Sequence, residues 1–171
     1  GLDLLACGEM GIGNTTPATA MICAVTGASP GQATGLGTGI PETARARKIA
    51  LIESALAVNR PDPSDGLDLL AKIGGLEIAA MTGAMLQGAV RRVPVLLDGV
   101  IATAAAMVAA VMVPGVKAFF IAGHRSAEPA HDRALEWLGL SPLLDLGMRL
   151  GEGTGAALAM PVVEAAAGVL A

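Results

Sequence analysis

Short apolar runs alternate with longer stretches of helical pattern along this chain of 171 residues, and this alternation constrains the fold most strongly. The short runs are of strand length, and each is followed by a glycine-containing loop and then by a helical stretch. They lie at Leu2–Cys7, Val93–Leu97 and Ala118–Ala122. Strands joined through helices pair in parallel, because the crossover returns the chain in the same direction. The sequence therefore predicts an α/β protein with a largely parallel sheet flanked by helices.

The predicted helices fill the spaces between these runs. They extend from Thr15 to near Gly27, over Pro41–Val58, Leu67–Ile73, Leu76–Arg92, Ile101–Val113 and Glu128–Leu138, and onward from Thr154. Thr15 and Thr16 supply hydroxyls that suit a helix start, and Pro17 is tolerated in a first turn. A turn-rich break at residues 59–66 and the Gly74-Gly75 pair separate three of these helices.

The composition excludes several classes of function. Hydrophobic residues make up 53% of the chain, but only Phe119, Phe120 and Trp137 are aromatic, which argues against binding single-stranded nucleic acid by stacking. The net charge is −4 and no basic run exceeds two residues, so we expect no nucleic-acid partner. Cys7 and Cys23 are too far apart for a C-x-x-C motif. We expect free thiols and a reducing, cytoplasmic location.

One uncharged segment, Gly99–Val116, reaches the 18 residues that are the lower limit for a membrane span. It is rich in alanine and carries a proline, so a buried helix after a buried strand is the favoured interpretation. Pro161 and Glu164 interrupt the apolar tail Thr154–Ala171 in the same way. No basic stretch precedes an apolar run at the start, and the run from Leu2 suggests entry in the middle of a fold. We therefore expect no membrane partner and no secretory signal.

Polar residues follow each of the three predicted strands. Glu9 follows the first, Asp98 the second, and His124 and Ser126 the third. The carboxyl ends of parallel strands form the ligand crevice of open sheets, so these residues predict a small-molecule site. Asp98 either binds a ribose hydroxyl or caps the helix that begins near Gly99. We expect His124 to be a satisfied polar residue at the strand end.

For the other polar residues the sequence favours structural roles over functional ones. His131 is expected on a solvated helix face, and no His, Cys, Asp and Glu spacing suggests a metal site. Ser126 lacks the G-x-S-x-G surroundings of an activated nucleophile. The methionines are mostly core fillers, with Met10, in a glycine loop, as the exception.

The segment GEMGIGNTTP at Gly8–Pro17 is the strongest local signal. Its glycines allow a close approach of the backbone to an anion, and the helix that follows presents free N–H groups. It matches neither the G-x-x-x-x-G-K-[ST] nor the G-x-G-x-x-G fingerprint. Two interpretations stay open, a phosphate cradle and a tight strand-to-helix turn with ordinary caps.

Two further glycine segments carry charged residues. Gly35–Gly39 supplies backbone donors for phosphate with Lys48 as a charge partner, or it is a surface loop with Lys48 on a solvated helix face. Glu152 lies between Gly151 and Gly153 near a helix start. The glycines either isolate its carboxylate from water and raise its pKa for general-base catalysis, or Glu152 simply interacts with the helix dipole.

Six blocks of sequence together resemble the nicotinate-nucleotide–dimethylbenzimidazole phosphoribosyltransferase family, and they occur in the order found in that family. The blocks are GEMGIGNTTPATA (Gly8–Ala20), GLGTG (Gly35–Gly39), GGLEIAAMTGAML (Gly74–Leu86), RRVPVLLDGVIATAAA (Arg91–Ala106), GHRSAEPAH (Gly123–His131) and LLDLGMRLGEGTGAALAMP (Leu143–Pro161). The resemblance covers nearly the whole chain but only about the C-terminal half of a family member. Residues 1–171 are accordingly expected to form a single α/β phosphoribosyltransferase domain.

The resemblance implies a Rossmann-like α/β fold with part of a small helical domain from the chain end, and a homodimer. It implies transfer of the phosphoribosyl group of nicotinate mononucleotide to 5,6-dimethylbenzimidazole in the synthesis of the lower ligand of vitamin B12. The products are α-ribazole 5′-phosphate and nicotinate, and no metal or redox cofactor is needed. Alternatives are a catalytically silent homologue that binds a nucleotide or a partner, and a nucleotide hydrolase. Apolar surface left by the missing half predicts self-association.

The resemblance also assigns residues to roles. Glu152 corresponds to the catalytic base that takes a proton from one benzimidazole nitrogen while the other attacks the ribose. Met10 and Leu150 correspond to the base pocket. The residues implied for nucleotide and phosphoribosyl binding are Glu9, Gly11, Asn14, Thr15, Thr16, Gly37, Gly39, Lys48, Asp98, Gly99 and Ser126.

Overall fold

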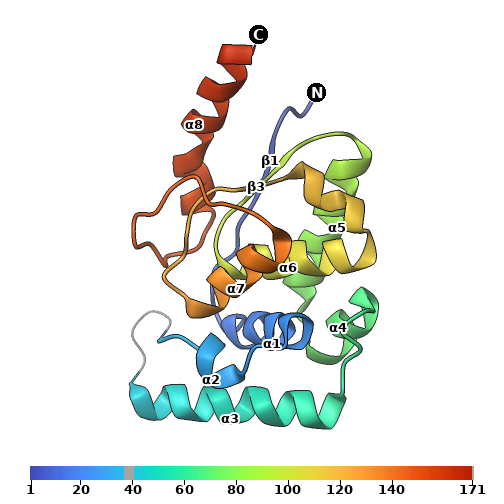
Figure 1. The fold of residues 1–171 in the computed structure, drawn as a ribbon, viewed down its shortest axis with the longest axis vertical. Coiled ribbons are helices and arrows are strands. Elements are labelled where there is room, and N and C mark those ends of the chain that lie inside the picture. The colour runs from blue at the N-terminus through green and yellow to red at the C-terminus, as the bar shows by residue number, and fades with distance from the viewer. Residues whose placement is uncertain (37–40, 171) are drawn as a thin grey trace.

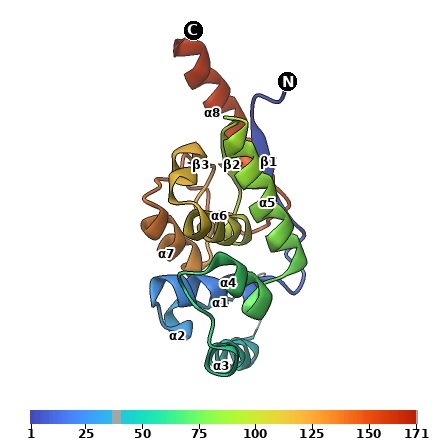
Figure 2. The same cartoon turned by 90° about the vertical axis from the view of Figure 1, so that its right-hand side faces the viewer.

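The computed structural model describes residues 1–36 and 41–170, in which three strands form one parallel sheet. The strands are β1 (Leu5–Cys7), β2 (Val95–Leu97) and β3 (Phe120–Ala122), paired in the order β1-β2-β3 (Figure 2). In this register Leu5 lies opposite Val95, and Val95 lies opposite Phe120. The sheet confirms the α/β fold that the sequence predicted, although each strand begins two or three residues later than expected.

Helices connect and cover these strands. Their bounds are α1 Thr15–Thr26, α2 Pro30–Ala33, α3 Glu42–Asn59, α4 Gly66–Ile73, α5 Leu76–Val90, α6 Val100–Met112, the 3₁₀ helix η1 Pro114–Phe119, α7 Pro129–Leu138 and α8 Thr154–Leu170. The sequence analysis did not predict α2 or η1. Both are short and begin at a proline, and so short a helix has too few residues to show a hydrophobic period.

The two faces of the sheet are covered differently. Side chains alternate along β2, so Val95 and Leu97 face the main core with α1, α5 and α6, whereas Leu96 faces the other way. There it packs against Ala156 and Ala159 of α8. Residues 100–110 of α6 are all buried, which explains why this uncharged stretch is a core helix. Within the described ranges, no helix has both the length and the apolarity needed to cross a membrane.

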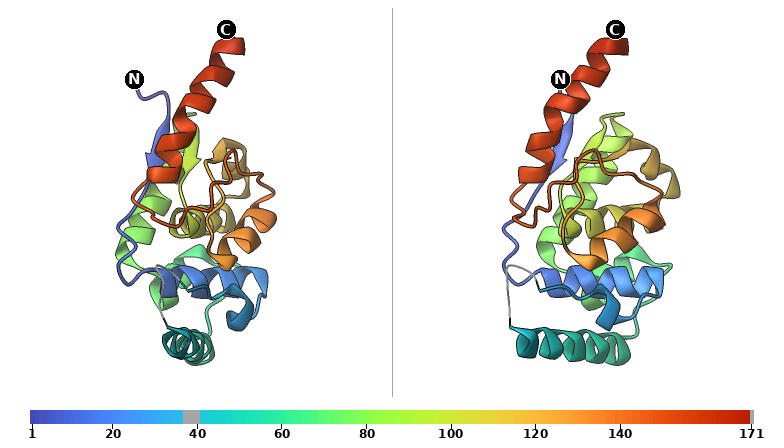
Figure 3. Two further views of the ribbon diagram at one scale, coloured as in Figure 1. Left: turned by 90° about the vertical axis from the view of Figure 1, so that its left-hand side faces the viewer. Right: turned by 60° about the vertical axis from the view of Figure 1, so that its left-hand side comes forward.

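The helices are stacked away from the sheet toward one end of the molecule (Figure 1). α1 contacts α3 on one side and α6 and α7 on the other, and α3 forms the outermost layer. At the opposite end, α8 leans out beside the N-terminal segment and β1 (Figure 3). Pro161 lies inside α8 without ending it. The N-terminus of α1 lies close to α3, where Lys48 contacts Thr15, and it shares a pocket with Ser126 and Glu128 of the loop before α7.

Candidate active site

The loop between β1 and α1 contains a carboxylate, that of Glu9, which accepts hydrogen bonds from other residues of the same loop. Glu9 Oε2 accepts hydrogen bonds from the backbone N–H of Gly11 and, at 2.6 Å, from the side-chain amide of Asn14. Gly11 and Gly13 have φ of +73° and +76°, a region that favours glycine. Two of the donors that the sequence offered to a phosphate are thus engaged by Glu9. The loop therefore holds the Glu9 carboxylate in a fixed orientation. We expect the donors that contact a phosphate at the start of α1 instead.

Lys48 lies at the start of α1 although it belongs to α3. Its Nζ donates a hydrogen bond of 2.9 Å to Thr15 Oγ1, so residues 33 positions apart meet here. Burial lowers the pKa of Lys48, and the carboxylate of Glu128 raises it in part. Lys48 is therefore half-buried beside a helix N-terminus, and not on a solvated helix face. A cation beside free N–H groups is suited to bind a phosphate.

A pocket of about 270 Å³ joins Lys48 to the loops at the carboxyl ends of all three strands. Eight residues implied by the sequence line it: Glu9, Met10, Gly11, Thr15, Lys48, Gly99, Ser126 and Leu150. Six other residues complete the lining: Val100, Ile101, His124, Glu128, Arg149 and Gly151. The pocket contains the beginnings of α1 and α6 together with Lys48 and Arg149. The carboxylates of Glu9 and Glu128 line the same pocket, and the helix N-termini and the cations are the groups in it that suit an anionic ligand.

Some implied residues lie elsewhere. Asn14 lines a separate shallow hollow with Gly13 and Pro17, and Thr16 is half-buried in the first turn of α1. Gly37 and Gly39, which belong to the second glycine segment, lie outside the described residues.

Glu152 occupies an exposed position on a strained loop. Its φ is +58°, between Gly151 at +81° and Gly153 at +74°, so three successive residues are left-handed. Of the two interpretations left open by the sequence, isolation of the carboxylate from water is not seen in this chain, because the side chain is exposed. The flanking glycines serve the backbone instead, since both have positive φ, and the loop passes so close to Gly8 that a Cβ added there would overlap the main chain of Gly153.

The Glu152 loop lies against the Glu9 loop. The N–H of Glu152 donates to the carbonyl oxygen of Glu9 at 2.8 Å. Glu152 lines a hollow with Cys7, Gly8, Glu9 and Met10. Because Glu9 and Met10 also line the Lys48 pocket, these two residues connect Glu152 with the candidate phosphate site.

Asp98 does not cap the helix that follows it, which was one of its two expected roles. It is 2% exposed, and it accepts hydrogen bonds from the backbone N–H groups of Gly153, Gly155 and Ala156. It therefore caps α8, which is distant in sequence, and not the helix that follows it. Its neighbour Gly99 reaches the pocket instead.

The expectation that His131 lies on a solvated face is wrong. Its exposed fraction is 0%, its Nδ1 accepts from the N–H of Ser126 at 2.8 Å, and its Nε2 lies 2.9 Å from Thr103 Oγ1. Thr103 in turn donates to the carbonyl of Gly99 at 2.8 Å. His131 thus ties together the two pocket loops that contain Ser126 and Gly99. The signal was present in the sequence, since Ala134, Leu135 and Leu138 share its helix face.

His124 is only partly satisfied. Its Nδ1 lies 3.1 Å from the carbonyl oxygen of Arg125, while its buried Nε2 has no hydrogen-bond partner within the described residues. Nε2 lies 3.7 Å from Asp98 Oδ1. His124 is a polar residue at the strand end, as the sequence predicted, but only one of its two ring nitrogens has a hydrogen-bond partner among the described residues.

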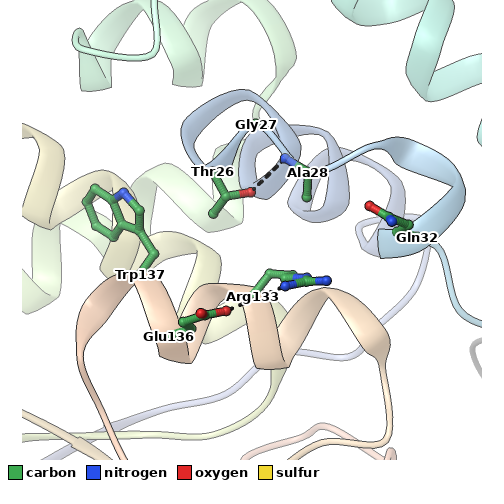
Figure 4. Close-up of a pocket in the computed structure, with 7 residues that line it drawn as sticks. All are labelled: Thr26, Gly27, Ala28, Gln32, Arg133, Glu136 and Trp137. Atoms are coloured by element: carbon green, nitrogen blue, oxygen red, sulfur yellow. Dashed lines mark hydrogen bonds and ion pairs between the residues drawn. The ribbon is translucent and has the colours of Figure 1, made fainter.

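A second hollow, of about 400 Å³, lies at the other end of α1 (Figure 4). It is lined by Thr26, Gly27, Ala28, Gln32, Arg133, Glu136 and Trp137. Arg133 is directed to Glu136 at 3.6 Å, and both side chains are at least half exposed. This hollow receives no strand end and no buried charged group, so it is a weaker candidate than the pocket at Lys48. Among the described residues, no cluster of three or more metal-ligating side chains occurs at either place.

Comparison with known proteins finds a family that matches the full length of this chain. The family profile described as phosphoribosyltransferase (DBI_PRT) covers residues 1–171. The nicotinate-nucleotide–dimethylbenzimidazole phosphoribosyltransferase of Chloroflexus aurantiacus is 56% identical over 170 residues, which are 99% of this chain and 48% of that protein. The enzyme of the same name from Desulforudis audaxviator is 53% identical over 171 residues, 100% of this chain and 48% of that protein. The chain thus spans about half the length of the curated relatives it matches.

Solved structures agree. The crystal structure of CobT from Thermus thermophilus superposes with a TM-score of 0.92 at 48% identity, covering 98% of this chain and 50% of that one. A crystal structure of the nicotinate-nucleotide-dimethylbenzimidazole phosphoribosyltransferase from the same organism gives a TM-score of 0.86 at 46% identity, with 98% and 49% coverage. Since the family profile matches the full chain and relatives are more than half identical to it, this chain belongs to the DBI_PRT phosphoribosyltransferase family.

Proposed function

We propose that this chain carries a phosphoribosyl-transfer site that moves the phosphoribosyl group of nicotinate mononucleotide to 5,6-dimethylbenzimidazole. The products are α-ribazole 5′-phosphate, a precursor of the lower ligand of vitamin B12, and nicotinate. The observation that carries this proposal is the pocket in which Lys48 meets Thr15 at the start of α1. The substrates are proposed from the names of the relatives, and the pocket is the proposed binding site for the phosphate of the nucleotide.

In this proposal the phosphate is held by Lys48, Thr15 and the N-terminus of α6 at Gly99. Anchoring the phosphate orients the ribose, and departure of nicotinate builds positive charge on the ribose carbon. Positioning of this kind accounts for much of the rate in such a displacement. The attacking base lies toward Met10 and Leu150, which are 65% and 61% exposed and offer an apolar surface to a flat ring.

Glu152 is the proposed general base. It takes the proton from one nitrogen of the benzimidazole while the other nitrogen attacks the ribose, so no charge accumulates on the ring. A general base contributes about 10²–10⁴-fold to the rate. Its exposure in this chain means that the acceptor base, or a further part of the protein, must exclude water from it.

The exposure of Glu152 also favours a second candidate, a chain that binds the nucleotide without transferring it. Titration with nicotinate mononucleotide, followed by a turnover assay, separates the two candidates. Binding without turnover selects the second candidate. Release of nicotinate without any added base indicates a nucleotide hydrolase.

The decisive experiment measures nicotinate release with and without 5,6-dimethylbenzimidazole for the chain, for Glu152→Gln and for Glu164→Gln. Glu164 is an exposed acid on α8, the helix that follows Glu152, and serves as the matched control. We expect base-dependent turnover that falls about 10²–10⁴-fold in Glu152→Gln and stays unchanged in Glu164→Gln. Equal turnover in all three proteins refutes the role of Glu152.

We also propose that the chain self-associates, as a homodimer or a larger assembly, in the cytoplasm. Leu158, Val162 and Val169 on α8 are 53%, 43% and 86% exposed, and Cys7 and Cys23 are free and buried. Apolar side chains gathered on one protruding helix favour contact with another surface. A monodisperse monomer in multi-angle light scattering contradicts this proposal.

A further inference from the structure

Asp98 binds the backbone of the segment that follows Glu152. Its Oδ2 accepts from the N–H of Gly153 at 3.1 Å, and its Oδ1 accepts from the N–H groups of Gly155 and Ala156 at 2.8 and 3.1 Å. The donors lie 55–58 residues away in the sequence, so these contacts are tertiary. The first N–H groups of a helix have no partner within it, and Asp98 supplies one for the start of α8.

This contact stabilises a strained backbone whose own hydrogen bonds run from the N–H and the hydroxyl of Thr154 to the carbonyl oxygen of Gly151. Glu152 has a Cβ, so its φ of +58° is unfavourable, and residues on both sides are also left-handed. On one side the loop is attached to the Glu9 loop through the Glu152 N–H. On the other side it is attached to Asp98 through Gly153. Glu152 therefore lies between two anchors, one of which is a single side chain.

Asp98 is poorly placed to act on a ligand directly. It is 2% exposed, and both of its oxygens already accept hydrogen bonds from the main chain. The charge that it carries is favourably placed at the positive end of α8. Gly99, the next residue, lines the Lys48 pocket, so the loop as a whole reaches both parts of the site.

We infer that Asp98 is a positioning residue that fixes the conformation of the Gly151–Gly153 loop and thereby the location of Glu152. It acts without contacting substrate. The catalytic consequence rests on the proposed function, because only there is Glu152 the general base. The structural part of the inference is independent of that function and is tested separately.

The first test is amide hydrogen exchange in Asp98→Asn, measured by NMR on the whole chain. The asparagine amide replaces one acceptor oxygen with a donor that opposes a backbone N–H. We expect exchange to accelerate about tenfold or more at Gly153, or at Gly155 and Ala156, according to which of them faces the new NH₂ group. Unchanged exchange at these three amides overturns the inference.

Asp65→Asn is the matched control, because Asp65 also caps a helix. Its Oδ1 accepts from the N–H groups of Leu67 and Asp68 at the start of α4. This variant should accelerate exchange in α4 and leave the amides after Glu152 unchanged. Acceleration after Glu152 in both variants indicates a general loss of stability, and also overturns the inference.

The second test separates positioning from binding through the kinetics of nicotinate mononucleotide. Positioning predicts that Asp98→Asn lowers kcat about tenfold or more while KM for the nucleotide changes less than about twofold. A raised KM with an unchanged kcat assigns Asp98 to the ligand instead. If the parent chain does not turn over, the proposed function fails, but the exchange experiment still decides whether Asp98 holds the loop.

Discussion

His131 lies at the centre of a buried network whose geometry requires a neutral imidazole. Nδ1 accepts from the Ser126 N–H, so it cannot carry a proton, and Nε2 must carry the hydrogen that is donated to Thr103. Thr103 has used its own hydrogen on the carbonyl of Gly99. Burial lowers the pKa of His131 to about 3, with further lowering from His124 and Arg125. Acidification is therefore the perturbation that probes the network.

The sign and size of the effect follow from this depressed pKa. In the unfolded chain the imidazole gains a proton below its ordinary pKa of 6.5, whereas in the folded chain it stays neutral down to about 3. The stabilisation is therefore complete above pH 6.5 and is lost progressively as the pH falls toward 3. Each pH unit corresponds to about 1.4 kcal/mol, so at pH 5 we expect a loss of about 2 kcal/mol from this one group.

The assay is urea unfolding followed by circular dichroism at about pH 7.5 and about pH 5, for the chain and for His131→Asn. Asparagine retains an acceptor for the Ser126 N–H but does not titrate, so the loss between the two pH values should be about 2 kcal/mol smaller in the variant. Other groups titrate in both proteins and cancel. An equal loss in the two proteins refutes the reasoning. If the variant does not fold, NMR titration of the His131 ring in the parent decides, and a pKa near the ordinary 6.5 refutes it equally.

Two further predictions concern the surroundings of the site. Gly155→Ala should lower the free energy of unfolding by about 3 kcal/mol, because the new Cβ would overlap the buried His124 ring. The exposed helical Gly83→Ala, with open space around it, should raise that free energy by about 0.5–1 kcal/mol, and chemical denaturation of the two variants checks the contrast. Glu128→Gln should lower the pKa of Lys48 below its value in the parent chain, since Glu128 is the charge that raises it. NMR titration of the Lys48 side chain measures this, and an unchanged or higher pKa contradicts it.

Features with a local signature were predictable from the sequence. The three strands and most helices follow from short apolar runs, glycine punctuation and capping residues, all of which act within a few residues. The buried character of α6 likewise follows from its lack of charge. No local pattern links Lys48 with Thr15, which are 33 positions apart. Only the family resemblance, which assigned both residues to one binding site, implied that they lie close together.

The two errors have different causes, a local signal that was overlooked and contacts with a distant part of the chain. His131 was assigned to solvent on its residue type, although Ala134, Leu135 and Leu138 place its helix face in the core. As a helix cap, Asp98 was expected at the start of the helix that follows it, but the N–H groups that it accepts from belong to α8 and the residue before it. Hydrogen bonds of this kind depend on tertiary packing, which residue type and local spacing do not encode.

Several glycines are needed at the site because other parts of the chain pass too close to them for a side chain to fit. A Cβ at Gly8 would overlap the backbone of Gly153, one at Gly123 would lie 2.8 Å from the carbonyl oxygen of Leu97, and one at Gly155 would overlap His124. These glycines therefore let the loops after β1 and β3 and the start of α8 approach one another at the strand ends. The approach brings Asp98 within reach of the N–H groups of α8 and holds the loop of Glu152 against Glu9. Close packing of backbone against backbone at these glycines thus allows the side chain of Asp98 to reach the loop and fix the position of Glu152.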